Sequence, residues 1–215
     1  MRGSQGALTQ MTDILRTVLL FGAPGVGKGT QGKLLGAIPG FVHMASGDIF
    51  RTLDRESRLG KKFLQYSSQG LLVPDEVTIE VWRDYVDRQI GTQVYRPASD
   101  LLVLDGIPRN VAQAGVMAGH VQVLRVVHLR PPGIDEMVER LKRRALQEGR
   151  HDDADEAVIR RRFEVYEKET SPMLAYYDAG LIWDISALGS PAEVLLKILK
   201  AIVPIYNEHF ANPLG

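Results

Sequence analysis

The chain has 215 residues, of which 45% are hydrophobic and 24% charged, a composition typical of one globular domain with a sizeable core. Its 26 basic and 26 acidic residues cancel, so overall charge indicates neither a nucleic-acid nor a membrane partner. The sequence contains no cysteine, which excludes disulfides, thiolate zinc sites and cysteine nucleophiles. We therefore expect a cytoplasmic protein without zinc, whose anion sites arise from local clusters of charge.

The start of the chain carries no targeting signal that we recognise. Met-Arg-Gly-Ser at residues 1–4 resembles an expression tag, and no basic region is followed by an apolar stretch there, so we predict no signal peptide. The apolar runs at 17–21 and 101–104 are far too short to span a bilayer. We treat residues 1–16 as an N-terminal tail and 17–215 as a single domain.

Short apolar runs alternate with longer amphipathic segments along the rest of the chain. The apolar runs predict strands at 17–21, 41–44, 101–104, 122–129 and 181–185. The segments between them predict helices at 27–37, from 46, from 74 or 75, at 134–144, at 153–177 and at 191–202. This alternation predicts an α/β fold with a five-stranded parallel sheet flanked by helices. Ligands of such sheets bind at the carboxyl ends of the strands.

A few residues within these elements carry structural predictions. We expect Leu34 and Leu35 on the inner face of the first helix, and Ser46 as the cap of the second. Trp82 and Trp183 are interpreted as core residues.

The segment Gly22-Ala-Pro-Gly-Val-Gly-Lys-Gly-Thr30 follows a predicted strand and opens a helix, the context of a phosphate-binding loop. Glycines let backbone N–H groups converge on an anion, and the helix presents its positive end to it. Lys28 can reach the terminal phosphates of a nucleotide. The predicted phosphate-binding residues are Gly25, Val26, Gly27, Lys28, Gly29 and Thr30.

Two residues are candidates for holding Mg²⁺. A hydroxyl residue usually follows the lysine of such a loop directly, whereas here Gly29 intervenes before Thr30, so a direct bond from Thr30 to the ion is left open. Asp105 ends a buried strand on the ligand side of the sheet, where a carboxylate can hold a Mg²⁺-bound water. The alternative for Asp105 is an ordinary turn residue.

The loop has the form Gly-x-Pro-Gly-x-Gly-Lys-Gly-Thr-Gln, which resembles adenylate kinases and their close relatives. Three further blocks match that family in the same order, so the resemblance covers about residues 17–205: Ser46-Gly-Asp-Ile-Phe-Arg51, Gly70-Leu-Leu-Val-Pro-Asp75 and Leu104-Asp-Gly-Ile-Pro-Arg109. It implies a P-loop NTPase fold and direct phosphoryl transfer from ATP, with Mg²⁺, to AMP. Two ADP form reversibly, and no side chain acts as nucleophile.

The resemblance places the AMP phosphate and sugar against two of these blocks. It implies that Arg51 binds the AMP phosphate and that Ser46 lies near adenine, although the family usually has Thr at this position. The backbone around Leu72 and Val73 would contact the base and ribose.

The block that ends the third strand completes the expected AMP site. Gly106 permits close approach of the backbone to a base, and Arg109 offers a bidentate phosphate contact. In the family a glutamine equivalent to Gln113 hydrogen-bonds adenine, whereas pyrimidine-specific relatives tend to carry asparagine. The family usually has Phe where Ile107 stands.

Arginines gather in the second half of the chain. Transfer between two nucleotides collects negative charge, which guanidinium groups stabilise. The resemblance assigns Arg140 and Arg144 to the ATP adenine and phosphates, Arg150 to the transferred group and AMP, and Arg162 to the acceptor side. Counting from Asp152-Asp153 points instead to Arg161, but the Arg-Phe-x-x-Tyr spacing favours Arg162. The expected catalytic residues are Lys28, Arg109, Arg144, Arg150 and Arg162; the alternative is a solvated, salt-bridged helix face.

Short insertions would cover the two nucleotides. We expect an AMP-binding subdomain at about 46–74 and a short lid at about 144–153, which leaves no room for a zinc ribbon. Asp152 and Asp153 are predicted to cap the next helix and to orient arginines. Gly189 matches a loop that touches the ATP adenine in the family.

Three alternatives accompany this interpretation. The nearest is the same chemistry on UMP or CMP, for which Ser46 and Gln113 are the discriminating residues. The others are a non-catalytic nucleotide-binding protein on the same fold and a nucleotide-switch or motor ATPase. The expected ligands are ATP, AMP and ADP, bound by a monomer.

Overall fold

The computed structural model describes residues 14–131, 133–149, 153 and 155–215. At its centre lies a five-stranded sheet in the order β2-β3-β1-β4-β5, in which every neighbouring pair is parallel. The strands are β1 Leu15–Phe21, β2 Phe41–Ala45, β3 Leu101–Asp105, β4 Val121–Arg130 and β5 Ile182–Ser186. The predicted fold class is confirmed, although β1 begins at Leu15, inside the segment predicted as a tail.

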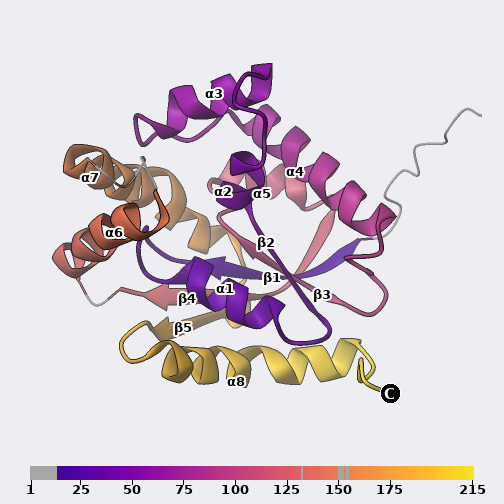
Figure 1. Ribbon diagram of the computed structural model, residues 1–215. Coiled ribbons are helices and arrows are strands. Elements are labelled where there is room, and N and C mark those ends of the chain that lie inside the picture. Colours follow the sequence, from indigo (N-terminus) through magenta and orange to yellow (C-terminus); the bar gives the residue numbers. More distant parts are fainter. Residues whose placement is uncertain (1–13, 132, 150–152, 154) are drawn as a thin grey trace, which may run out of the picture.

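Helices cover both faces of the sheet. They are α1 Lys28–Gly36, α2 Ser46–Arg51, α3 Arg58–Ser67, α4 Asp75–Gly91, α5 Val111–Met117, α6 Ile134–Glu148, α7 Glu156–Val165 and α8 Pro191–His209. In Figure 1, α8 runs below the sheet and α4 lies above it. None of the described helices is both long and apolar enough to cross a membrane.

The central strands are buried on both faces because helices cover both. All five residues of β3 are buried, so the strand shows a continuous apolar run rather than alternation. At the edge of the sheet, β5 is far less covered, and Trp183 is 42% exposed with the Arg125 guanidinium 4.9 Å from its ring centre. The prediction that Trp183 belongs to the core is therefore wrong, whereas Trp82 is buried as predicted.

The first helix also departs from its predicted orientation. Leu35 is fully buried, but Leu34 is 37% exposed. Successive helical residues lie about 100° apart around the axis. When Leu35 points into the core, Leu34 therefore lies at the edge of the buried face of the helix and stays partly exposed.

The helix predicted at 153–177 is divided in the structure. α7 begins at Glu156 and ends at Val165, a π-helical turn follows at Tyr166–Thr170, and a 3₁₀ helix spans Ser171–Tyr176. Pro172 has no backbone N–H to donate and its ring clashes with the preceding turn, which explains why a regular α-helix does not continue here.

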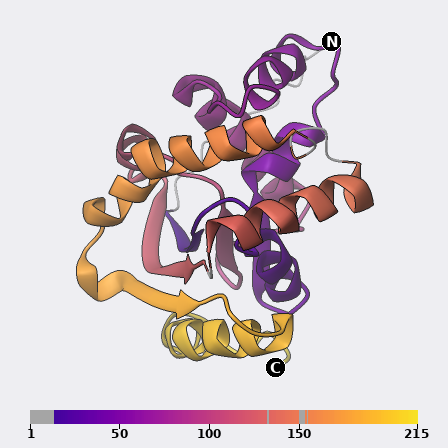
Figure 2. The same ribbon diagram turned by 90° about the vertical axis from the view of Figure 1, so that its left-hand side faces the viewer.

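The parallel arrangement brings all the carboxyl ends of the strands to one edge. That edge lies at the left of Figure 1 and faces the viewer in Figure 2, with α6 and α7 lying over it. The loops that follow β1, β2 and β3 therefore meet beneath these two helices.

Candidate active site

A cleft of about 640 Å³ opens at this edge. Every described residue that the sequence singled out for nucleotide binding lines it, although these residues come from widely separated segments. They are Gly25, Val26, Gly27, Lys28, Gly29, Thr30, Ser46, Arg51, Leu72, Val73, Asp105, Gly106, Arg109, Gln113, Arg140, Arg144, Arg162 and Gly189. Arg150, predicted for the same site, lies outside the described residues. Within the described residues, Arg162 lines the cleft and Arg161 does not.

The glycine-rich loop between β1 and α1 forms one wall of the cleft. Gly25 and Gly27 have φ angles of 81° and 106°, which side chains with a Cβ rarely adopt. The Lys28 ammonium donates to the carbonyls of Gly22 at 2.6 Å and of Ala23 at 3.1 Å. Burial lowers the pKa of Lys28 to about 8, against the opposing effect of Asp105.

The end of β3 is connected to the start of α2. The Ser46 hydroxyl donates to the Gly106 carbonyl at 2.6 Å, and Arg109 Nε donates to the same oxygen at 2.8 Å. The expectation that Ser46 caps α2 is wrong, because the cap residue is Ala45. The Ser46 side chain instead connects the ends of β2 and β3. The Gly106 carbonyl thus positions both the Ser46 hydroxyl and the Arg109 guanidinium in the cleft.

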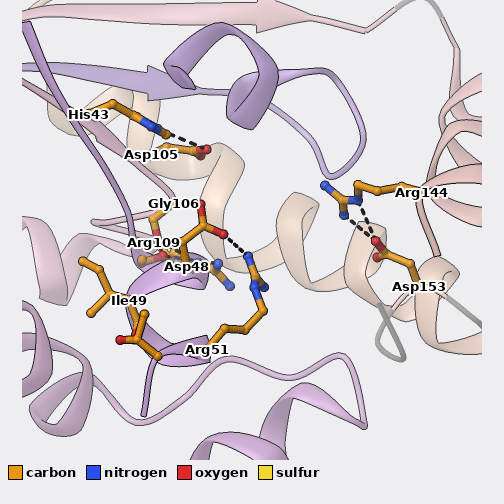
Figure 3. Close-up of polar contacts among 11 residues, drawn as sticks. His43, Asp48, Ile49, Arg51, Asp105, Gly106, Arg109, Arg144 and Asp153 are labelled. Atoms are coloured by element: carbon orange, nitrogen blue, oxygen red, sulfur yellow. Dashed lines mark hydrogen bonds and ion pairs between the residues drawn. The ribbon is translucent and has the colours of Figure 1, made fainter. Parts of the chain in front are cut away.

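Arg51 lies at the last turn of α2, with its guanidinium paired to Asp48 three residues earlier. The Nη2–Oδ1 distance is 2.5 Å (Figure 3). Burial raises the pKa of Asp48, but the hydrogen bond and charge of Arg51 outweigh it, so this pKa lies below its ordinary value. Sequence reasoning did not single out Asp48, although its i,i+3 spacing from Arg51 was a usable signal.

Asp153 joins the arginines of α6 and α7. Its Oδ2 accepts from Arg144 Nε at 2.7 Å and forms an ion pair with Arg144 Nη2 at 2.6 Å (Figure 3). Its Oδ1 accepts from Arg162. The prediction that Asp153 orients arginines is confirmed. The prediction that it caps α7 is wrong, because Asp155 is the cap and accepts from the Ala157 N–H at 2.8 Å. Asp152 lies outside the described residues.

Asp105 is at the carboxyl end of β3, 8% exposed, and faces His43 on β2. His43 Nε2 lies 4.0 Å from Asp105 Oδ2 (Figure 3), and this nitrogen is buried without a hydrogen-bond partner in the described structure. Burial lowers the pKa of His43, with Asp105 acting in the opposite direction. No local sequence pattern indicates this pair, because the parallel pairing of β2 with β3 brings the two residues together.

The side chain of Gln113 is buried and held from two directions. Its Nε2 donates to Asp75 at 2.7 Å, and its Oε1 accepts from the Arg109 N–H at 2.7 Å. Gln113 is 1% exposed, yet it contributes to the wall of the cleft. Sequence reasoning treated Asp75 only as a helix start and did not single out its role beside Gln113.

Potential metal ligands are sparse around the cleft. No group of three or more His, Asp or Glu side chains that could hold a metal occurs among the described residues. Asp105 has the carboxylate chemistry that Mg²⁺ prefers, and the exposed Thr30 offers a hydroxyl. This donor set fits an ion that is held mainly by phosphates and water.

Comparison with known proteins agrees with the architecture of the site. A family model described as adenylate kinase matches residues 20–181. Adenylate kinases from Thermus thermophilus and Kocuria rhizophila are each 36% identical, over 88% and 86% of this chain and 98% and 97% of their own lengths. One from Leptospira biflexa is 34% identical over 87% of this chain and all of its own length. The chain therefore belongs to the adenylate kinase family.

Proposed function

We propose that the protein transfers a phosphoryl group reversibly from ATP to AMP, forming two ADP. One observation carries this conclusion: a single cleft contains both a phosphate-binding loop and a second anion site. Lys28 lines one part of the cleft, and Arg51 and Arg109 line another. Two phosphate sites in one cleft suit a reaction between two nucleotides, whereas an ATPase needs only one.

ATP would bind along the glycine-rich loop. Its phosphates would accept hydrogen bonds from the loop N–H groups and draw the Lys28 ammonium away from the Gly22 and Ala23 carbonyls. Arg140 and Arg144 of α6 and Gly189 line the same cleft, and we assign them to the ATP side. Negative charge from the phosphates would favour the protonated form of Lys28.

We assign Mg²⁺ to Asp105 through a water molecule, with Thr30 as a further oxygen donor. The bound ion would neutralise phosphate charge as it develops. Asp105 itself serves to hold the water, and its burial restricts the positions that the carboxylate can take.

AMP would occupy the other half of the cleft. Arg51 and Arg109 would bind its phosphate, while Gln113 and the backbone of Leu72 and Val73 would contact the base and ribose. Ser46 supports this site indirectly, because its hydroxyl and Arg109 share the Gly106 carbonyl. Gln113 favours AMP over UMP and CMP as acceptor.

The transfer would be direct. An AMP phosphate oxygen attacks the γ-phosphorus of ATP, the bond from that phosphorus to the β–γ bridging oxygen breaks, and ADP leaves. The acceptor oxygen is already charged, so no general base is needed. Arg109, Arg144, Arg162 and Arg150 would stabilise the charge of the transferred group. In this scheme the protein contributes positioning and electrostatics and forms no covalent intermediate.

Two segments would close over the nucleotides. We assign the AMP-binding subdomain to about 46–74, which contains α2 and α3, and the lid to about 144–153. Closure would exclude water and so prevent hydrolysis of ATP. We further propose a cytoplasmic monomer, because one chain supplies the cleft described here and nucleotides are intracellular substrates; size-exclusion chromatography tests the monomer.

The test is a coupled assay of ADP formation with ATP and Mg²⁺, offering AMP, UMP, CMP and GMP separately. We expect strong preference for AMP and loss of at least about 10²-fold in activity for Lys28→Ala. Preference for a pyrimidine nucleotide would contradict the acceptor assignment alone. Binding of ATP without turnover on any acceptor would favour a non-catalytic nucleotide-binding protein.

A further inference from the structure

The Asp75 carboxylate lies outside the cleft and accepts a hydrogen bond from Gln113, the residue that is expected to bind the base of AMP. Asp75 Oδ1 accepts hydrogen bonds from Gln113 Nε2 at 2.7 Å and from Asn110 Nδ2 at 2.9 Å. Asp75 is the first residue of α4 and does not line the cleft. Any effect of Asp75 on a bound nucleotide must therefore act through a neighbouring side chain.

Asn110 reinforces this arrangement from the other side. It caps α5, and its Oδ1 accepts from the Gln113 backbone N–H at 2.8 Å while its Nδ2 donates to Asp75. The backbone and the side chain of Gln113 are thus both tied to the same small network. The Arg109 N–H, which donates to Gln113 Oε1 at 2.7 Å, links the network to the expected phosphate-binding arginine.

These contacts permit only one orientation of the Gln113 amide. A half-turn of the amide would place Oε1 against the Asp75 carboxylate, two acceptors facing each other. The same turn would place the Nε2 hydrogens against the Arg109 N–H, two donors facing each other. Both changes leave buried polar groups unpaired, which is costly. In the observed orientation, one N–H of Nε2 and one lone pair of Oε1 remain for a ligand.

The fixed amide matches adenine and opposes 6-oxopurines. Adenine presents a ring-nitrogen acceptor beside an exocyclic amino donor, which suits an N–H and a carbonyl oxygen that cannot exchange places. A 6-oxopurine presents a carbonyl oxygen where adenine has the amino group. In the same pose that oxygen would face Oε1, and only a turned amide could bind it.

We propose that Asp75 is a positioning residue that sets the preference for adenine over 6-oxopurine monophosphates by locking the Gln113 amide. The inference rests on the proposed function, because it takes AMP as the acceptor and Gln113 as the residue that hydrogen-bonds its adenine. Asp75 does not contact substrate in this scheme. Its removal abolishes one of the two side-chain contacts that fix the amide, so the turned orientation costs less, and no group is removed from the cleft.

The experiment compares Asp75→Ala, Asp75→Asn and the unsubstituted protein with AMP and with inosine monophosphate as acceptors. Alanine removes the acceptor, and asparagine preserves the shape of the side chain while offering either an oxygen or an NH₂ group to Gln113. Glu76→Ala is the matched control, because exposed Glu76 is the other acidic residue in the first turn of α4. Circular dichroism melting curves report whether each variant folds, and the asparagine variant serves if the alanine variant does not.

We expect both Asp75 variants to lower the ratio of kcat/KM for AMP to that for inosine monophosphate by about tenfold, the size of one hydrogen bond. The Glu76→Ala ratio should equal that of the unsubstituted protein. A purely structural role would lower both rates together and leave the ratio constant, which would overturn the inference while the proposed function stands. An unsubstituted protein that does not phosphorylate AMP would overturn both.

Discussion

Arg144 and Asp153 form a two-pronged contact in which Nε and Nη2 of the arginine lie 2.7 and 2.6 Å from the same carboxylate oxygen. Asp153 is fully buried, and its other oxygen accepts from Arg162. One carboxylate thus fixes guanidinium groups from two helices that lie over the cleft. This arrangement allows the positioning of the arginines to be tested without changing the arginines themselves.

Asp153→Asn should weaken both contacts and lower the free energy of unfolding by about 1–3 kcal/mol, because two partly buried guanidinium groups lose a charged acceptor. We also expect kcat/KM for ATP to fall, since Arg144 is no longer held over the phosphates. Urea denaturation and steady-state kinetics measure the two effects. Asp155→Asn is the control, because asparagine caps a helix as well as aspartate does. Equal behaviour of the two variants would contradict the positioning role.

Lys28 should make ATP binding depend on pH. Its pKa of about 8 in the folded protein lies below the ordinary value of 10.5 because desolvation disfavours the charged ammonium. Above pH 8 the free protein loses this proton, and bound phosphates restore it. Calorimetry at pH about 9 in two buffers of different ionisation enthalpy should therefore show uptake approaching about one proton per ATP. Lys28→Met should abolish the uptake, and uptake that persists in this variant would exclude Lys28 as its source.

The same pKa shift makes a prediction for stability. Between pH 8 and 10.5 the unfolded chain binds a proton that the folded chain has lost, so the contribution of Lys28 to the free energy of unfolding rises with pH through this window. Below pH 8 the unfavourable burial of the ammonium is fully present. The unfolding free energy of Lys28→Met minus that of the unsubstituted protein should therefore fall as pH rises, because only the unsubstituted protein gains stability through this window. A difference that is constant across the window would contradict the lowered pKa.

Gly106→Ala should damage both stability and AMP binding. Gly106 has a φ angle of 73°, and an added Cβ would lie 2.8 Å from Ser46 Oγ. The left-handed backbone alone costs about 1–2 kcal/mol for alanine, and displacement of Ser46 should raise KM for AMP. Gly115→Ala is the control: Gly115 lies in α5, a Cβ there meets nothing within 4 Å, and stability should rise by about 0.5–1 kcal/mol. Thermal melts measure the stability of both variants, and steady-state kinetics measure KM for AMP. A Gly106→Ala variant as stable as Gly115→Ala, with unchanged KM for AMP, would contradict the prediction.

Arg51→Lys tests the AMP phosphate site. Lysine keeps the charge but loses the planar fork that binds two phosphate oxygens at once, so KM for AMP should rise about tenfold. KM for ATP should stay within about twofold, since Arg51 is assigned to the other nucleotide. Arg55→Lys, at an exposed position outside the lining of the cleft, should change neither. Equal increases for both nucleotides would show that Arg51 does not belong to the AMP side.

Local features of the sequence were sufficient to predict the sheet and the glycine-rich loop. The five strands are short apolar runs that remain recognisable because helices bury both faces of the sheet. The loop needs glycines at fixed places beside a strand and a helix, so the pattern and its context identify it together. The prediction of burial was wrong for Trp183, because β5 lies at the edge of the sheet and is less covered than the central strands.

Resemblance was sufficient to name the residues that line the cleft, but not to predict their contacts. Ser46 looked like a helix cap because caps are decided locally, and its actual partner is the Gly106 carbonyl, which is brought near by the pairing of β2 with β3. Asp153 looked like a cap for the same reason, and Asp155 takes that role. Local spacing alone does not distinguish the two aspartates.

The sequence by itself therefore determined the five strands and most of the helices, though not α5, and it indicated which side chains carry charge toward the carboxyl edge of the sheet. Only the tertiary structure decided the pairs that orient those side chains: Asp153 with Arg144, Asp75 with Gln113, and His43 beside Asp105. The physical reason is the distance along the chain over which each kind of interaction acts. Backbone preferences and hydrophobic periodicity act within a few residues, whereas a hydrogen bond between distant residues requires strand register and helix packing to bring its partners within about 3 Å.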